Sequence, residues 1–328
     1  MNKSKAKHVS VIFDTDMDSD CDDVGALAVL HALMDLGEVN IVGIICDVPL
    51  KASADCVVAI NKYYGRADIP VGLLYEEDYE NGKKYQDYRK NRQNVSTFRD
   101  LYIEKVAHEF NTDKISREKY WDPVLLYRHL LSESEDHSVV IIAVGFLTVL
   151  SKLLDSVSDE ISPLSGEQLI KKKVKKLVTM GMGKFPSCYA QFNWRMDWEA
   201  AKRVINNWPT ELIVQINGTQ ILTGKSLSIK TPPSNPVRKC YEIYLRKENK
   251  GHYSWDHITV LYGVRGANPY FEELRGYRII LDENEFGKNY WIEDNSGKPP
   301  HIYLKLKNPK KLLMKEIETL MIKLPNIK

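Results

Sequence analysis

The chain has 328 residues, of which 43% are hydrophobic and 27% are charged, so it can bury a full core and is not intrinsically disordered. Its 46 Lys and Arg residues nearly balance its 44 Asp and Glu residues, and the net charge of +2 offers no general attraction to nucleic acid or to an anionic membrane. We therefore expect neither kind of partner, and any ligand must be recognised at a local site.

The cysteines and the N-terminus bear on the compartment. The five cysteines are odd in number, widely spaced and without a C-x-x-C pair, which argues against a disulfide framework and against a zinc ribbon. We expect reduced, mostly buried thiols. The basic N-terminus is followed by an apolar run too short for a signal peptide or a membrane span. We expect a soluble, cytoplasmic protein, although removal of an export signal would leave the same sequence in a periplasmic or exported one.

Strand-like and helix-like segments alternate along the chain. The predicted strands, which are short and rich in β-branched residues, are 8–13, 39–46, 69–74, 138–145, 175–181 and 211–216. The predicted helices are 22–37, 52–65, 123–132, 147–154, 197–207 and a packed terminal helix in 307–325. This alternation predicts an α/β fold with a mostly parallel central sheet covered on both faces by helices. In such sheets, ligands bind beyond the carboxyl ends of the strands.

No linker rich in Pro, Gly or Ser divides the chain and no internal repeat is present, so we expect residues 1–328 to form a single domain. Residues 75–120 are polar, rich in tyrosine and too long for a loop in a compact domain. We expect them to form a helical insertion or a flap over the site. The lysine-rich run 171–176 is expected to be a solvated loop rather than a nucleic-acid patch.

The outlying feature of the sequence is a cluster of aspartates that follows the first predicted strand. Carboxylates this close repel one another at neutral pH and are stable only if they are solvated or if a cation lies among them. Because the apolar strand anchors the loop at the carboxyl edge of the sheet, we favour a cation over a solvated acidic turn. Oxygen ligands select calcium or magnesium rather than zinc. The cluster consists of Asp14, Asp16, Asp18, Asp20, Asp22 and Asp23.

Three kinds of metal site compete for this loop. An EF-hand fails, because the sixth position counted from Asp14 is Ser19, the twelfth is Gly25, and a strand precedes the loop. A magnesium-dependent phosphatase of the haloacid dehalogenase type would use Asp14 and Asp16, but Asp18 stands where that pattern has Thr or Val. The third pattern, D-x-D followed by D-D at a helix start, places three or four carboxylates around one cation.

The third pattern resembles the inosine-uridine preferring nucleoside hydrolase family. The segment DTDMDSDCDDVGALAVL is similar to a longer-looped variant of that family's opening motif, DTDMGxDxDDxxALAxL. Later segments follow in the family's order, namely YYGRADIPVG, VGFLTVLSKLL, VTMGMG, AQFNWRMDWEAAKRV, INGTQILTG and SWDHITVLYGVRG. The resemblance covers residues 9 to about 266 and implies a Rossmann-like, nucleoside hydrolase-like sheet with one calcium ion (Ca²⁺) at its carboxyl edge.

The resemblance also implies roles for individual residues. Asp16, Asp23 and Asp256 would supply carboxylate ligands to the calcium ion, and Val144 a backbone carbonyl ligand. Asp16 would in addition act as the general base on the attacking water. The implied substrate contacts are Asp22 at a ribose hydroxyl, Asn193 and Gln191 at the sugar, Asp47 near the sugar, and Trp255 near the base.

Some of these assignments have alternatives. Asp18 also fits the spacing of the shorter motif and would then be the base, but we prefer Asp16 because it directly follows the strand. Asp20 is either a peripheral ligand or a cap of the loop. Gln191 stands where the family has a carboxylate. Trp255 stands where many members have a histidine that protonates the leaving group, and it either stacks on the base or packs in the core. The nearby candidates for that acid are His252 and His257.

The sequence thus predicts calcium-dependent hydrolysis of the N-glycosidic bond of a ribonucleoside, or of a related N-glycoside, to free base and sugar. The alternatives are the phosphatase of the haloacid dehalogenase type and a non-catalytic relative that binds a nucleoside or a sugar. The expected partner is a small-molecule substrate, and the resemblance implies a homo-oligomer, either a dimer or a tetramer.

Overall fold

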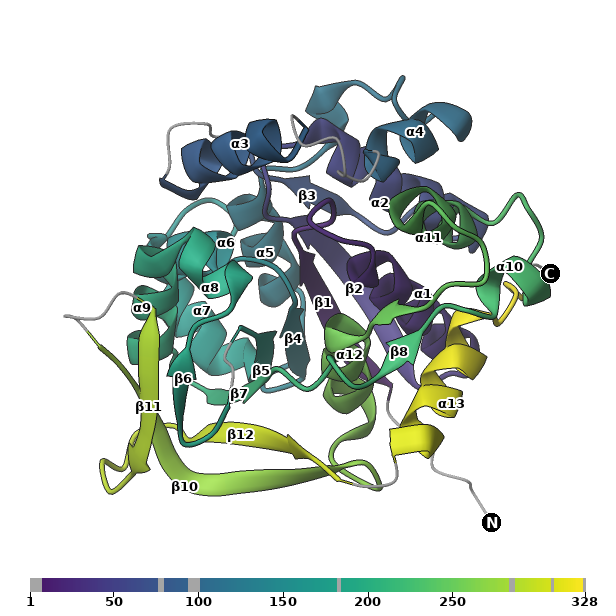
Figure 1. The fold of residues 1–328 in the computed structure, drawn as a ribbon. Coiled ribbons are helices and arrows are strands. Elements are labelled where there is room, and N and C mark those ends of the chain that lie inside the picture. Colours follow the sequence, from purple (N-terminus) through teal and green to yellow (C-terminus); the bar gives the residue numbers. More distant parts are fainter. Residues whose placement is uncertain are drawn as a thin grey trace, which may run out of the picture.

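The structure is a computed structural model and describes residues 8–75, 80–93, 101–181, 184–282, 287–307 and 310–326. Its central strands are β1 (Val9–Thr15), β2 (Val39–Cys46), β3 (Val71–Leu73), β4 (Val139–Ala143), β5 (Val174–Met180), β6 (Ser187–Tyr189), β7 (Glu211–Gln215), β10 (Phe271–Leu281), β11 (Lys288–Glu293) and β12 (His301–Leu306). They form a ten-stranded sheet in the order β3-β2-β1-β4-β5-β7-β12-β10-β11-β6 (Figure 1). The strands from β3 to β12 pair in parallel, and β10, β11 and β6 extend the sheet in antiparallel fashion.

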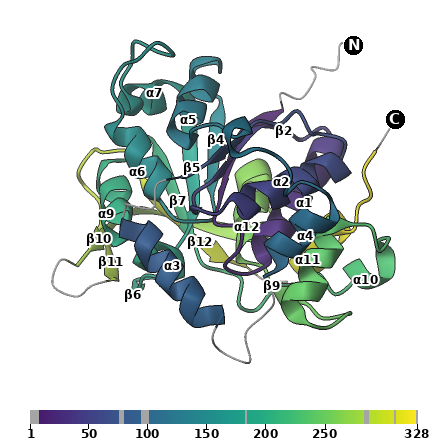
Figure 2. The same ribbon diagram turned by 90° about the horizontal axis from the view of Figure 1, so that it is seen from above.

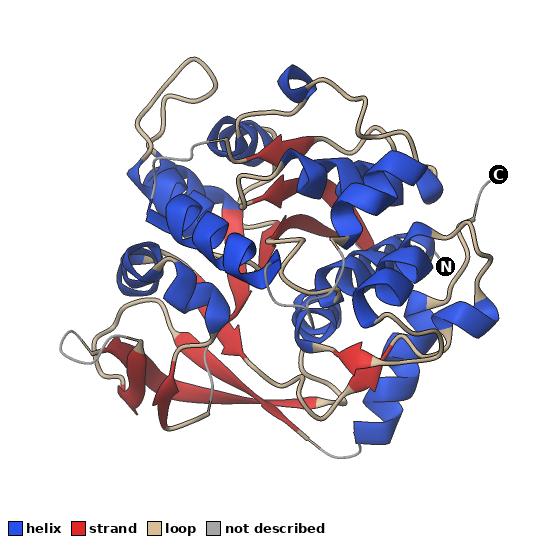
Figure 3. Ribbon diagram, turned by 45° about the horizontal axis from the view of Figure 1, so that its top comes forward, coloured by secondary structure: helices blue, strands red, loops and turns tan. Residues whose placement is uncertain are grey.

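Apolar side chains alternate along β1 and give the sheet two buried faces, with Val11 and Phe13 in one core and Ile12 in the other. The first core packs under α1 (Asp22–Asp35), α2 (Lys51–Tyr63), α4 (Tyr102–Glu109), α11 (Pro236–Leu245), α12 (Trp255–Arg265) and α13 (Lys310–Met321). The second packs under α5 (Pro123–Ser132), α6 (Thr148–Asp155), α7 (Gly166–Lys173), α8 (Phe192–Met196) and α9 (Trp198–Asn207). Figure 2 and Figure 3 show the sheet between these two sets of helices. The predicted α/β class with helices on both faces is therefore confirmed.

The described part of segment 75–120 is helical. It contains α3 (Glu80–Gln93), α4 and a 3₁₀ turn at Arg117–Lys119. Residues 76–79 and 94–100 of that segment lie outside the described residues. Figure 1 shows α3 and α4 beyond the carboxyl ends of β1 and β2, which is the edge of the sheet where a ligand is expected.

The prediction of a solvated lysine loop at 171–176 is wrong. Helix α7 begins with a capping box at Ser165 and continues to Lys173, and β5 follows directly from Val174. Lys176 lies in the strand with its Nζ 4.6 Å from the centre of the Tyr262 ring. The prediction failed because the charges of this run belong to a helix end, which favours cations, and to the first residues of a strand that is buried from Leu177 onward.

Other elements were not predicted. The terminal helix α13 is present, but β12 and the long antiparallel strand β10 precede it. A separate two-stranded sheet pairs β8 (Leu222–Thr223) with β9 (His252–Tyr253), and a short helix, α10 (Leu227–Lys230), follows β8. None of the helices in the described ranges has both the length and the apolarity needed to cross a bilayer. All five cysteines are free thiols. Four of them are buried and Cys188 is half-buried, which agrees with the expectation of mostly buried thiols.

Candidate functional site

The acidic loop lies at the carboxyl edge of the sheet, between the end of β1 at Thr15 and the start of α1 at Asp22. Most of its carboxylates are shielded from solvent, because Asp16 is 2% exposed and Asp18 is fully buried, whereas the Asp20 side chain is 26% exposed. Asp22 and Asp23 open α1, where the helix dipole favours negative charge, and each is 1% exposed. A solvated acidic turn is therefore excluded, and the charges must be compensated within the protein.

Helix α12 brings a further carboxylate to this loop from the far end of the chain. The backbone N–H of Asp256, in the first turn of α12, donates to Asp22 Oδ2 at 3.2 Å. The two helices approach closely because α1 has a glycine at their contact: a Cβ on Gly25 would lie 2.0 Å from His257 Nε2. Ligand atoms of Asp22, Asp23 and Asp256 lie within 4.8 Å of one another, the spacing of a metal site.

A cavity of about 280 Å³ opens onto this cluster. Asp16, Asp23 and Asp256 form its acidic wall, and Val144, which follows β4, lies beside them. The polar residues of the lining are Ser19, Asp20, Gln191 and Asn193, and the remaining lining residues are Tyr88, Met180, Phe192, Ile216, Tyr244 and Trp255. The structure thus brings seven of the candidate site residues together around one cavity, namely Asp16, Asp23, Val144, Gln191, Asn193, Trp255 and Asp256.

The oxygens at this wall suit a hard cation. Within the described residues, no hydrogen-bond donor reaches Asp16 Oδ2, Asp23 Oδ2 or Asp256 Oδ1, although all three atoms are buried. Thr15 Oγ1 donates to the other oxygen of Asp23 and orients that carboxylate. Buried carboxylate oxygens without donors are costly unless protonated or bound to a cation, and an all-oxygen set is the one that calcium or magnesium takes. The residues present therefore fit a divalent cation.

The pKa values describe the same crowding. Burial, with the nearby charges of Asp20 and Asp18, raises the pKa of Asp16 to about 8. Burial and neighbouring carboxylates also hold the pKa values of Asp22, Asp23 and Asp256 well above the usual range. A bound cation would favour the ionised carboxylates, so proton release and cation binding are coupled at this site.

Two of the predicted substrate contacts are not on the surface of the cavity. Asp22 lies behind the wall, where its carboxylate accepts a hydrogen bond from the backbone N–H of Asp256. It is one of the three carboxylates, with Asp23 and Asp256, whose spacing suits a metal ion. Asp47, directly after β2, is fully buried, and no described donor reaches its carboxylate. It borders Gly145, where a Cβ would lie 2.8 Å from Asp47 Oδ1 and 2.5 Å from the Asp16 backbone nitrogen. The Asp47 carboxylate and the Asp16 backbone therefore pack against the same glycine, Gly145.

Asp14, the nucleophile that a phosphatase of the haloacid dehalogenase type would need, is buried inside the fold. It is fully buried and accepts a hydrogen bond from Tyr127 at 2.7 Å. It does not line the cavity, so no substrate phosphate could reach it there. The structure therefore argues against a phosphatase of this type, because its nucleophile would be inaccessible to substrate.

Asp18 points away from the cavity and into an ion pair. Its carboxylate accepts from Tyr85 and, at 3.2 Å, from Arg89 Nε, and both residues belong to α3. Arg89 also pairs with Glu104 of α4. This geometry favours Asp16 over Asp18 as the residue facing a substrate, and it ties α3 to the acidic loop so that Tyr88 reaches the cavity.

Neither histidine proposed as the leaving-group acid lines the cavity. His257 is fully buried against Tyr241, with Nε2 3.1 Å from the phenol oxygen, and burial lowers the pKa of His257 to about 3. It is a neutral core residue. His252 lies near Asp20 instead. Two tyrosines that line the cavity, Tyr88 and Tyr244, carry phenol groups that could donate a proton. They were not predicted, because nothing in the sequence around a helical tyrosine indicates that it faces a cavity.

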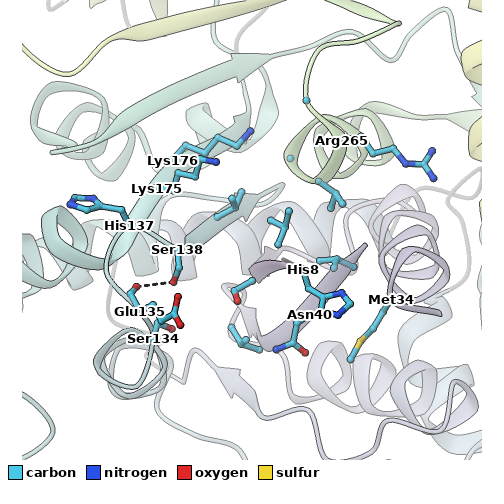
Figure 4. Close-up of a pocket in the computed structure, with 18 of the residues that line it drawn as sticks. His8, Met34, Asn40, Ser134, Glu135, His137, Ser138, Lys175, Lys176 and Arg265 are labelled. Atoms are coloured by element: carbon cyan, nitrogen blue, oxygen red, sulfur yellow. Dashed lines mark hydrogen bonds between the residues drawn. The ribbon is translucent and has the colours of Figure 1, made fainter. Parts of the chain in front are cut away.

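A larger hollow, of about 1230 Å³, lies at the opposite, amino-terminal edge of the sheet (Figure 4). Two of its basic residues are engaged elsewhere: Arg265 pairs with Glu38 and Glu316, and Lys176 lies over the Tyr262 ring. The smaller cavity holds the buried acidic cluster, and we therefore take that cavity as the candidate site.

The chain matches the family model described as inosine-uridine preferring nucleoside hydrolase over residues 11–283. No curated protein sequence matches it. An inosine-uridine preferring nucleoside hydrolase from Bacillus anthracis has 16% identity and a TM-score of 0.65, with 96% of this chain and 99% of that chain covered. A plant nucleoside hydrolase, PpNRh1, has 17% identity and a TM-score of 0.65, with the same shares covered, 96% and 99%.

A third solved structure is similar in fold but has a different description. It is the type III effector protein XopQ, complexed with adenosine diphosphate ribose. Its identity to this chain is 11% and its TM-score is 0.70, with 97% of this chain and 94% of that chain covered. At these identities the likeness to solved structures shows the fold alone.

Proposed function

Since the chain belongs to the inosine-uridine preferring nucleoside hydrolase family and is thus an N-glycosyl hydrolase, we propose that it hydrolyses ribonucleosides to free base and ribose in a calcium-dependent reaction. The observation that carries the proposal is the set of buried carboxylate oxygens without donors at the wall of the cavity, on Asp16, Asp23 and Asp256. These oxygens come from two distant parts of the chain, and a close helix contact at Gly25 brings them together.

The cation would be held by the carboxylates of Asp16, Asp23 and Asp256 and by the backbone carbonyl of Val144. Asn193 donates its side-chain amide to that same carbonyl and so orients it. When bound, calcium supplies positive charge that orients sugar hydroxyls and makes a water molecule easier to deprotonate.

Asp16 is the proposed general base. Its Oδ2 is buried, has no described donor and belongs to a residue that lines the cavity, so it can accept a proton from the attacking water. The water oxygen forms a bond to the anomeric carbon while the bond from that carbon to the base nitrogen breaks. The electron pair of the broken bond leaves with the base, and an oxocarbenium-like charge develops on the sugar. Asn193 and Gln191, which line the cavity, are the proposed sugar-side groups.

Aromatic residues form the proposed pocket for the base. Phe192, Tyr244 and Trp255 line the same cavity as Asp16. The indole N–H of Trp255 donates to Thr219 at 3.3 Å, which fixes the ring in place. Stacking on these rings would hold the departing base in place, and the phenol of Tyr88 or Tyr244 is the proposed proton donor to it.

A panel of purine and pyrimidine ribonucleosides, with release of base measured with and without a calcium chelator, tests the proposal. Asp16→Asn removes the base and should lower kcat by about 10² to 10⁴-fold. Asp18→Asn is the matched control, because Asp18 faces Arg89 and should change kcat less than tenfold if it is not the base. Release of base that persists at full rate in Asp16→Asn or after chelation would contradict the proposal.

A second candidate is binding of a ribose-containing ligand without turnover. It is favoured by Gln191, a neutral amide at the cavity, and by the fold likeness to the effector whose structure contains adenosine diphosphate ribose. Calorimetry with ribose and with adenosine diphosphate ribose, combined with a search for released base, separates the two candidates. Tight binding with no product from any ligand of the panel would favour this second role.

A further inference from the structure

Beside the proposed calcium site lies a second cluster, made of Asp20, Asp22 and His252. One ligand atom from each residue lies within 4.8 Å of the others. His252 is 7% exposed, and its buried Nε2 has no hydrogen-bond partner among the described residues. Nε2 lies 3.6 Å from Asp20 Oδ2, within ion-pair distance when His252 is protonated but longer than a hydrogen bond. Two ligands of one tetrahedral ion, each bound at about 2.1 Å, lie about 3.4 Å apart. The observed separation is therefore closer to that of two ligands on one ion.

The fold fixes both ends of this pair. His252 belongs to β9, which pairs with β8 through Thr223, and its ring packs edge-on against Tyr244 at a centroid distance of 5.3 Å. The backbone carbonyl of Asp20 accepts a hydrogen bond from Tyr102 at 2.6 Å, and the backbone N–H of Asp22 approaches Asp20 Oδ1 at 3.4 Å. Neither side chain can move far without breaking these contacts.

The charge of the site also calls for more than one cation. Arg89 compensates Asp18, but no described lysine or arginine forms an ion pair with the remaining acidic residues of the cluster. One divalent cation would offset fewer than half of the negative charges that these carboxylates carry when ionised. They are Asp16, Asp20, Asp22, Asp23 and Asp256.

We propose that Asp20, Asp22 and His252 bind a second divalent cation beside the first, with Asp22 adjacent to Asp23 and Asp256 of the first site. The imidazole nitrogen selects a transition-metal ion such as Mn²⁺ or Zn²⁺ over calcium, which prefers oxygen ligands alone. The second ion would fasten the acidic loop to the β8–β9 sheet and place its charge next to Asp20 at the wall of the cavity. The inference rests on the proposed function only in that Asp22 lies beside the proposed calcium ligands Asp23 and Asp256.

The number of ions per chain tests this inference without reference to activity. The full chain is stripped with a chelator and dialysed against Mn²⁺ in the presence of saturating Ca²⁺, and both metals are then counted by atomic emission. We expect one Ca²⁺ and one Mn²⁺ per chain. His252→Phe keeps an aromatic ring against Tyr244 but cannot bind a metal, so it should lose the Mn²⁺ while retaining the Ca²⁺. His108→Phe is the matched control, since the His108 side chain is 82% exposed in α4, and it should retain both ions.

Anomalous scattering from crystals of the wild-type chain soaked in Mn²⁺ gives a result that depends on no variant. A peak between His252 Nε2 and Asp20 Oδ2 supports the proposal. Absence of a peak there, one ion per chain in the wild type, or Mn²⁺ retained in His252→Phe would overturn it. One Ca²⁺ with no Mn²⁺ would leave the proposed function standing, whereas no bound ion at all would remove the calcium site as well.

Discussion

Gly145→Ala should displace the two strand ends that form the site. A Cβ at this position would lie 2.5 Å from the Asp16 backbone nitrogen and 2.8 Å and 2.9 Å from the Asp47 oxygens. Ordinary contacts of this kind are about 3.5 Å, so the turn after β4 and the loop after β1 must separate by about 1 Å. The Asp47 side chain can rotate away, but the Asp16 nitrogen belongs to the backbone at the end of β1 and cannot.

The separation moves the Val144 carbonyl away from Asp16, and both are proposed ligands of one cation. Overpacking of this size costs about 1–3 kcal/mol of stability, and a misplacement of about 1 Å in an active site can cost about 10²-fold in rate. We expect Gly145→Ala to fold, to melt at a lower temperature, and to lose about 10²-fold in kcat/KM and a similar factor in calcium affinity.

Thermal unfolding, calcium calorimetry and release of base from nucleosides measure the three effects on one preparation. Gly251→Ala is the control, because its nearest atom to a new Cβ is the Thr223 carbonyl oxygen at 3.2 Å, in a small sheet that can adjust. If Gly145→Ala kept both calcium affinity and rate while Gly251→Ala also remained unchanged, the proposed joint use of Asp16 and Val144 would be refuted.

Three further predictions concern helix α3, pH and metal removal. Asp18→Ala removes one of the two carboxylates that pair with Arg89 and cuts the link from α3 to the acidic loop, so α3 and Tyr88 should loosen. KM should rise more than kcat falls, as steady-state kinetics on any accepted nucleoside would show. Burial lowers the pKa of His31 from 6.5 to about 3, so between these pH values the unfolded chain binds a proton that the folded chain does not. The free energy of unfolding should therefore fall, as pH drops through that window, by about 1.4 kcal/mol per pH unit for this group. In His31→Gln the pH dependence of the free energy of unfolding, measured with urea at several pH values, should be smaller by about one proton, and an unchanged pH dependence would contradict the assignment. Calcium at about 100 times its Kd should stabilise the folded chain by about 2.7 kcal/mol over the chelated form, and equal melting temperatures in calcium and in chelator would count against a calcium site.

The location of the site could be predicted because one structural rule determines it. Asp16 and Val144 each follow a buried strand, and neighbouring parallel strands end at the same edge, so the two residues had to be close. Asp23 follows from the start of the next helix. Asp256 could not be placed by that rule, since its position depends on the contact of α12 with Gly25, and only the family resemblance pointed to it.

The antiparallel extension of the sheet could not be predicted from the sequence pattern. Strand β10 alternates irregularly between buried and exposed residues, and its register with β12 shifts between Leu274 and Tyr277. Its partner β11 is polar at half of its positions. A strand whose buried side chains follow no strict period of two gives no local signal, and its pairing depends on tertiary contacts.

The aspartates of the loop show how far an acidic motif can be interpreted. Their spacing alone treats all of them as equivalent candidates for a cation, yet Tyr127 engages Asp14 and Arg89 engages Asp18 from positions more than 70 residues away. Those partners lie in α5 and α3 and have no sequence feature that marks them as such. Once these two carboxylates are removed from the set, Asp16 is the remaining loop carboxylate that both follows β1 directly and lines the cavity. The choice of base therefore depends on long-range partners that neutralise its neighbours, and testing Asp16 against Asp18 tests that reasoning directly.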